Sequence, residues 1–222
     1  MTLEPIPEIL PREIRDDRLR DILSQLSLGI ERTANCGTHL LKWFAEVDSL
    51  ERHRIVFMML LRQFLELLDA ISILVRQSSI DPCKLILRSM FEVFLSMEYM
   101  LQEDTRKRAS AFIVAYIYSV LKDYRKADPS TPEGQEHLSR ITSNQRFPVS
   151  PIPINPDWAT NIQMLESELA LPDFEEARRE YSRLQSKGLK NPRWYSLYDG
   201  PRNIEQLAAR VKLSALYESH YR

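Results

Sequence analysis

The chain has 222 residues and a formal net charge of −1, from 30 Lys and Arg against 31 Asp and Glu. This length predicts one domain, or one domain with an appendage, that buries a sizeable core without disulfides. The balanced charge excludes a surface that is basic throughout but leaves a local basic patch possible, and 5 Gly against 13 Pro favour long helices over sheets with tight turns.

Residues 1–12 contain three prolines and are expected to form an extended arm. They lack the apolar segment of a secretory signal peptide. From about Glu13 apolar residues recur every three to five positions, which predicts an amphipathic helix with a kink near Gly37. The members of this stripe are Ile14, Leu19, Ile22, Leu23, Leu26, Ile30, Leu40, Leu41, Phe44 and Val47.

A second, strongly apolar helix is predicted over about 51–77. Its composition invites a membrane-spanning interpretation. However, Arg62, Glu66 and Asp69 lie in its middle, and each charge is costly in lipid. We therefore expect a helix that is buried by protein neighbours, and no membrane contact.

Two further long helices follow. Asp81 and Pro82 have the pattern of an N-cap followed by the first helical residue, and they predict a third helix over 82–101. This helix is the most apolar of the chain. Asp104 or Thr105 opens a fourth helix, which ends before Asp128.

Residues 128–157 change character. A short helix is predicted over 132–143, and four prolines then follow within RFPVSPIPINPDW, which favours a stiff extended connector. Gly188 has the position of a helix C-cap. Further helices are predicted at about 157–170, 172–187, 201–211 and from Ser214 onward. The last has no stop signal before Arg222, so we expect the natural protein to continue.

These elements predict an all-α fold. Four long helices form a main bundle over 13–127, the Pro-rich connector covers 128–157, and a smaller helical region over 158–222 packs on the bundle and is truncated. Cys36 and Cys83 lack the spacing of metal ligands or of a disulfide scaffold, which indicates a reducing, cytoplasmic compartment.

A polar stripe interrupts the third helix. Arg88, Glu92, Ser96 and Tyr99 follow one another by four, four and three residues, so they share one helix face. The other faces are apolar, as in a central helix, and a buried charge must find a partner or water. The second helix carries a similar stripe, formed by Arg62, Glu66, Asp69, Ser72 and Arg76.

Two interpretations of these stripes stay open. In the first, the charges form a structural network that fixes the register of the helices. In the second, they line a ligand or RNA-processing cleft, in which Arg88 contacts an anion and Glu92 orients it or acts as general base. Arg88 and Glu92 are thus the candidate catalytic residues.

The segment LILRSMFEVFLSMEYML, with Arg88, Glu92 and Tyr99, resembles the bacterial family known as domain of unknown function 5677. The stretch from Trp194 through Ile204, Leu207 and Ala208 to Tyr217 and Tyr221 is also similar to that family. The resemblance covers most of the chain and implies an all-helical fold without an assigned activity. It marks Trp194, Tyr217 and Tyr221 as C-terminal candidates, and it implies a last helix that runs on to a serine and a histidine.

Some helical families of this kind look similar to HEPN-type ribonucleases and abortive-infection proteins, which carry an Arg and a His with four to six residues between them. Arg32 and His39 match that spacing. About one such match is expected by chance in this composition. We therefore interpret His39 as an ordinary histidine on a polar face.

The end of the chain resembles a helix-turn-helix. Ile204 to Leu213 precede Ser214, which caps a second helix. Lys212 stands where a glycine usually forms the turn, and a lysine enters a left-handed conformation only at a cost. The alternative is a pair of helices at a corner that packs on the main bundle.

Several common sites have no signal in the sequence. No glycine-rich phosphate loop, Ser-His-Asp or Cys-His arrangement, or Glu-x-x-His pair is present, so neither a cofactor nor a metal is expected. Arg106, Lys107 and Arg108 are interpreted as a solvated helix start, with phosphate contact as the alternative. Tyr116 and Trp194 are interpreted as packing residues.

Two hypotheses of function follow. The first is a helical effector in bacterial phage defence that acts on nucleic acid or nucleotides through Arg88 and Glu92. The second is a non-catalytic interaction or regulatory protein, with long apolar helices that support a homodimer. Duplex DNA binding through 203–222 is a third, weaker alternative.

Overall fold

The computed structural model describes residues 14, 16–46, 51–143 and 157–221. The expected arm over 1–12 and residues 144–156 of the Pro-rich connector lie outside these residues. The described residues form α-helices and short 3-10 helices without a strand, which confirms the all-α prediction. They are α1 (Asp17–Ala45), α2 (Arg52–Arg76), α3 (Ile80–Leu101), α4 (Thr105–Ala127), α5 (Pro132–Thr142), α6 (Asp157–Leu169), η1 (Pro172–Phe174), α7 (Glu175–Ser186), η2 (Trp194–Ser196), α8 (Ile204–Arg210) and α9 (Ser214–Tyr221).

The chain divides into two compact units. The first unit comprises Met1–Gln102 and Ile204–Arg222, and the second comprises Glu103–Asn203. The second unit therefore contains α4, which the sequence grouped with the preceding helices. The reason is that the buried side chains of α4, such as Val114 and Ile117, pack in one core with Phe174 and Tyr181.

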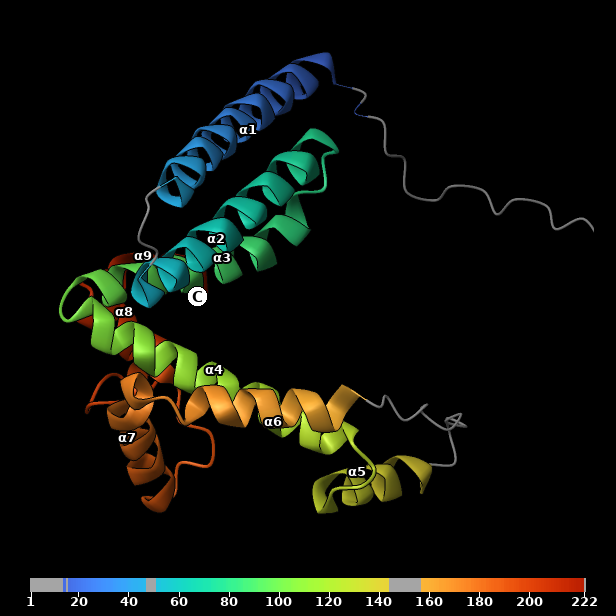
Figure 1. Cartoon of the computed structure of the whole chain (residues 1–222). Helices are drawn as coiled ribbons and strands as arrows, with labels where there is room; N and C mark the ends of the chain where they lie inside the picture. Colours follow the sequence, from blue (N-terminus) through green and yellow to red (C-terminus); the bar gives the residue numbers. More distant parts are fainter. Residues whose placement is uncertain (1–13, 15, 47–50, 144–156, 222) are drawn as a thin grey trace, which may run out of the picture. The chain divides into compact units, whose positions relative to one another are not determined.

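In the first unit, α2 packs between α1 and α3, and α3 also contacts α8 and α9 (Figure 1). Apart from Leu23, the buried residues of α1 are small: Ser27, Ala34 and Gly37. A Cβ atom on Gly37 would lie 2.3 Å from Cδ2 of Leu65, so glycine permits this close approach. Helix α1 runs without a break from Asp17 to Ala45, through Gly37, where a kink was expected.

In the second unit, α4 is the central helix, against which α5, α6, α7, η1 and η2 pack (Figure 1). Its N-terminus follows the sequence prediction, because the Asp104 side chain accepts a hydrogen bond from the Lys107 backbone N–H at 3.1 Å. Phe174 and Val114 are completely buried in the shared core. This core fixes α7 against α4 and so positions the segment that follows α7.

The sequence predicted where α3 begins and whether α2 could cross a membrane. Helix α3 begins at Ile80, earlier than expected, and Asp81 accepts a hydrogen bond from Lys84 at 2.9 Å instead of capping the helix. We expected α2 to be buried by protein and not to cross a membrane. Within the described ranges, no helix is both long enough and apolar enough to cross a bilayer.

Candidate functional site

The segment after α7 begins with the predicted glycine C-cap. Gly188 has a φ of 95°, a left-handed conformation that suits glycine. Its N–H donates to the Gln185 carbonyl at 2.9 Å, and the N–H of Leu189 donates to the Leu184 carbonyl at 3.2 Å. These two bonds form a Schellman motif, which ends α7 and sends the chain back towards α4.

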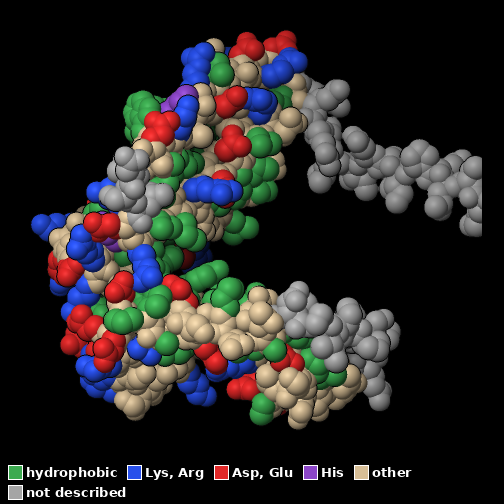
Figure 2. Space-filling model, viewed as in Figure 1, with side chains coloured by type: hydrophobic (Ala, Val, Ile, Leu, Met, Phe, Trp, Pro, Cys, Tyr) green, Lys and Arg blue, Asp and Glu red, His purple; other side chains and the backbone are tan. Residues whose placement is uncertain are grey.

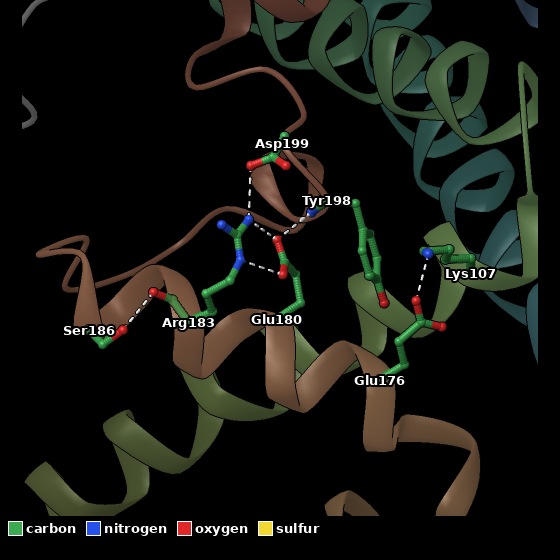
Figure 3. A network of polar contacts seen from close by, with 7 residues as sticks. All are labelled: Lys107, Glu176, Glu180, Arg183, Ser186, Tyr198 and Asp199. Atoms are coloured by element: carbon green, nitrogen blue, oxygen red, sulfur yellow. Dashed lines mark hydrogen bonds and ion pairs between the residues drawn. The ribbon is translucent and has the colours of Figure 1, made fainter.

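A polar network holds the far end of the same segment (Figure 3). Arg183 donates two hydrogen bonds to the Glu180 carboxylate, at 2.7 and 2.6 Å, and a third to Asp199 at 2.9 Å. Glu180 also accepts the backbone N–H of Tyr198 at 2.8 Å. Because the Glu180 side chain is only 13% exposed, the bonds to this carboxylate form with little competition from water, whereas Asp199 is 85% exposed.

The network stabilises a strained turn. Tyr198 and Asp199 both have left-handed backbones, with φ of 60° and 56°, which non-glycine residues adopt at a cost. The hydrogen bonds from Arg183 lower the pKa of Glu180, while burial of this carboxylate opposes them. A hydrogen bond from the same guanidinium lowers the pKa of Asp199. The ionised network thus compensates the strain of the turn.

Tyr198 connects this turn to the start of α4. The Lys107 ammonium lies 4.1 Å from the centre of the Tyr198 ring and 2.6 Å from Oε1 of Glu176. Burial, followed by the charge of Glu176, raises the pKa of the Tyr198 phenol. Lys107 is thus held between the Glu176 carboxylate and the Tyr198 ring.

Residues 189–194 lie between the Schellman motif and the network of Glu180 and Arg183. They run alongside α4 and line, together with it, a groove of about 720 Å³. Two contacts join its walls. Nζ of Lys122 donates to Oδ1 of Asn191 at 2.9 Å, and the rings of Phe112 and Trp194 meet edge to face with centroids 5.5 Å apart. The volume is in the range of small-molecule sites.

The groove combines cations with aromatic rings. Its described lining contains Lys122, Lys126, Lys190 and Arg193 against a single carboxylate, Asp123. Within the described part of the chain, the side chains of Lys126, Lys190 and Arg193 make no ion pair or hydrogen bond. The aromatic residues of the lining are Phe112, Tyr116, Tyr181 and Trp194. Such a surface is suited to an anion that also carries a ring.

Arg88 and Glu92, the candidate catalytic residues, lie on a face of α3 that is exposed. Leu85, one turn before Arg88, is 72% exposed, so this part of α3 is not the buried centre of a bundle. Further along the stripe, Ser96 is half-buried and Tyr99 is buried. Arg88 and Glu92 are therefore not charges buried in an apolar interior.

The stripe on α2 faces α1. Arg62, Glu66 and Asp69 line a cavity of about 500 Å³ with Glu31, Asn35 and Thr38 of α1, and no α3 residue lines it. Arg62 pairs with Glu66 at 2.8 Å. Towards the end of α2, Arg76 donates to Ser27 at 3.2 Å and to Glu31 at 2.5 Å. The α2 stripe thus contacts α1. Arg88 and Glu92 of α3 do not line the same cavity.

The family model of DUF5677, described as a family of unknown function, matches residues 54–222. The chain belongs to the DUF5677 family. The match includes α3 with Arg88 and Glu92 and the whole groove of the second unit, whereas α1 precedes it. Comparisons of the DUF5677 chain with curated proteins and with solved structures found no match.

Trp194 and Tyr217, two of the C-terminal candidates of the DUF5677 chain, belong to different units. Trp194 lies in the second unit and lines the groove, whereas Tyr217 belongs to α9 of the first unit. The side chain of Tyr221 lies outside the described residues. Between α8 and α9, Lys212 has the left-handed φ of 63° that the helix-turn-helix interpretation requires.

Sequence reasoning did not select the lysines of the groove. Lys122 and Lys126 lie on an amphipathic helix, where lysines are ordinary, and in the run Lys190-Asn191-Pro192-Arg193-Trp194 only Trp194 was a candidate. That run, which sets two cations and an indole beside a proline, is the signal that could have found the groove. Its meaning depends on α4 lying opposite.

Proposed function

We propose that this DUF5677 chain binds nucleotides or nucleic acid through the groove between α4 and residues 189–194. The observation that carries the proposal is the pairing of uncompensated cations with aromatic rings around one cavity. Four cations and one carboxylate give the lining a formal charge of +3. Phosphates neutralise such charge, and nucleobases stack on aromatic side chains.

A location in this groove explains how a chain with net charge −1 can bind an anion. The binding charge is concentrated in one cavity, and walls of low dielectric around a cavity focus its field. As a binding site for the anion, Arg88 with Glu92 has less support than the groove. These two side chains are exposed on α3, and neither lines the groove or the cavity between α1 and α2.

Binding of a labelled single-stranded oligonucleotide and of ATP to the full chain, measured by fluorescence anisotropy and calorimetry, tests this proposal. We expect binding at low salt. The logarithm of the binding constant should fall linearly with the logarithm of the salt concentration. Lys126→Ala combined with Lys190→Ala should weaken binding, while Arg88→Ala should leave it unchanged. Lack of binding at low salt, or loss only in Arg88→Ala, would contradict the proposal.

The helix-turn-helix alternative is tested in the same experiment with duplex DNA. If α8 and α9 bind the duplex, Arg210→Glu should abolish a salt-dependent shift that the groove variants retain. No shift of the duplex at low salt would exclude this alternative.

A second candidate function is a non-catalytic interaction protein that self-associates through α1. Figure 2 shows hydrophobic side chains at the surface of the first unit. On α1, apolar residues at heptad-like spacing form an exposed stripe, as in a coiled-coil seam. Its large members are Leu19, Ile22, Leu26, Leu40 and Trp43.

We retain bacterial phage defence as a proposed setting for nucleotide binding. It is supported by the anion binding proposed for the groove, whereas the Arg32–His39 spacing, expected about once by chance, adds no weight. Expression in a bacterial host challenged with phage tests it, because plaque counts should fall with the wild type and recover with Lys126→Ala combined with Lys190→Ala. Equal counts with and without the chain would exclude this setting.

A further inference from the structure

The two walls of the groove run in opposite directions, so its two ends differ. Asn191 lies opposite Lys122, and Trp194, three residues later, lies opposite Phe112. Along α4, Phe112 and Lys122 are ten residues apart, which is about 15 Å at the rise of an α-helix. The groove therefore has one end near Phe112 and another near Lys122.

The end near Phe112 is aromatic. Tyr116 follows Phe112 by one helical turn and is 57% exposed, so its ring is accessible. Trp194 is half-buried and held between Phe112 and Tyr195, at centroid distances of 5.5 and 5.8 Å. A held indole beside an accessible phenol ring forms a stacking surface for a nucleobase.

The end near Lys122 is basic, with three lysines against one carboxylate, Asp123. Lys122 and Lys126 lie one turn apart on α4, and Lys190 comes from the opposite wall, next to Asn191. A cation in the last turn of a helix, such as Lys126, also stabilises the helix dipole. That effect does not explain Lys190, which belongs to a loop. The convergence of cations from two walls indicates a phosphate-binding end.

Building on the proposed function, we propose that the groove binds, in a fixed direction, a nucleobase followed by at least two phosphates. The base stacks at Tyr116 and Trp194, and the phosphates lie at Lys126 and Lys190. Tyr116 and Lys126 are separated by about 15 Å along α4. A single 5′-phosphate, only one ribose from its base, does not reach across this distance. Nucleoside polyphosphates and short single strands share the required chemistry.

Isothermal titration calorimetry of the full chain with a ligand series tests this proposal. The series is adenosine, AMP, ATP, tripolyphosphate and a single-stranded adenylate tetranucleotide. We expect ATP or the tetranucleotide to bind at least about tenfold more tightly than AMP, because more phosphates reach the basic end. Preference for ATP identifies a nucleoside polyphosphate as the source, and preference for the tetranucleotide identifies a strand.

Two variants test the direction. Lys126→Ala should weaken ATP or tetranucleotide binding about fivefold to tenfold while changing AMP binding less than about twofold. Tyr116→Ala should weaken every base-containing ligand about fivefold or more and leave tripolyphosphate unchanged. Lys187→Ala, an exposed lysine outside the groove lining, is the matched control and should change nothing.

Different outcomes would contradict the proposed function and the directed binding mode. If no ligand of the series binds, the proposed function is wrong, and this inference with it. If AMP binds as tightly as ATP and the tetranucleotide, or if tripolyphosphate binds as tightly as ATP, the directed mode is wrong while anion binding in the groove stands. Loss of all binding in Lys126→Ala and Tyr116→Ala alike also contradicts separate ends, provided that circular dichroism shows both variants folded.

Discussion

Glu180 of α7 accepts the backbone N–H of Tyr198 at 2.8 Å, and this bond anchors the segment that forms one wall of the groove. The wall has no regular secondary structure between Gly188 and Trp194. Its position therefore depends on the Schellman motif at one end and on Glu180 with Arg183 at the other. The groove is as stable as these two anchors.

Replacing Glu180 by Ala should destabilise the chain by about 1.5–3 kcal/mol, the range for hydrogen bonds to charged groups. Glu176→Ala on the same helix is the control. Glu176 is 68% exposed, and the loss of its surface ion pair with Lys107 should cost less than about 1 kcal/mol. Urea unfolding measures both. Equal losses would mean that the buried network contributes no more than a surface ion pair.

The same network predicts acid sensitivity. The folded-state pKa of Glu180 is lowered by the hydrogen bonds from Arg183, so the folded state binds a proton less readily than the unfolded state. Its stabilising contribution is complete above the ordinary pKa of a glutamate, about 4.3, and is lost as the pH falls towards the folded-state value. Unfolding free energies measured from pH 6 to pH 3 should decline less steeply for Glu180→Gln. Identical slopes would contradict this assignment.

Gly37→Ala and Gly29→Ala form a matched pair within α1. Both replace a helical glycine, and at Gly29 the new methyl group meets no atom within 4 Å, so up to about 1 kcal/mol of stability is gained. At Gly37 the methyl group would lie 2.3 Å from Leu65, and overpacking there should cost about 1–3 kcal/mol. Thermal or urea unfolding compares them. A gain in both variants would show that α1 moves away from α2 without cost.

Arg88→Ala should change stability by less than about 0.5 kcal/mol, because the side chain is exposed on α3. It should also leave binding in the groove intact. A ribonuclease assay on the full-length protein provides the complementary measurement. Cleavage that depends on Arg88 would restore the catalytic interpretation of Arg88 and Glu92.

If α1 mediates self-association, Leu26→Lys should abolish it. Leu26 is 52% exposed in the middle of the apolar stripe, and a charge there would have to be desolvated at an interface. Analytical ultracentrifugation should show a dimer for the wild type and a monomer for the variant. Asp21→Lys, a charge change on an already polar exposed position, is the control and should leave the dimer. A monomeric wild type would exclude this function.

The sequence by itself determined the helical fold and many helix ends. Apolar residues at helical spacing, the Asp104 cap and the glycine at 188 act through neighbours a few residues away, so they can be recognised locally. Gly37 shows the limit of such reasoning. This glycine suggested a kink in α1, whereas in the structure it permits the close approach of Leu65 from another helix.

Only the tertiary structure decided which polar residues meet. Lys122 and Asn191 are 69 residues apart in the sequence, and neither carries a signal that points to the other. The stripes on α2 and α3 were visible at helical spacing, yet α2 turns its charges to α1 while Arg88 and Glu92 face solvent. Spacing defines the faces of a helix, but long-range packing decides which neighbour, or water, each face meets.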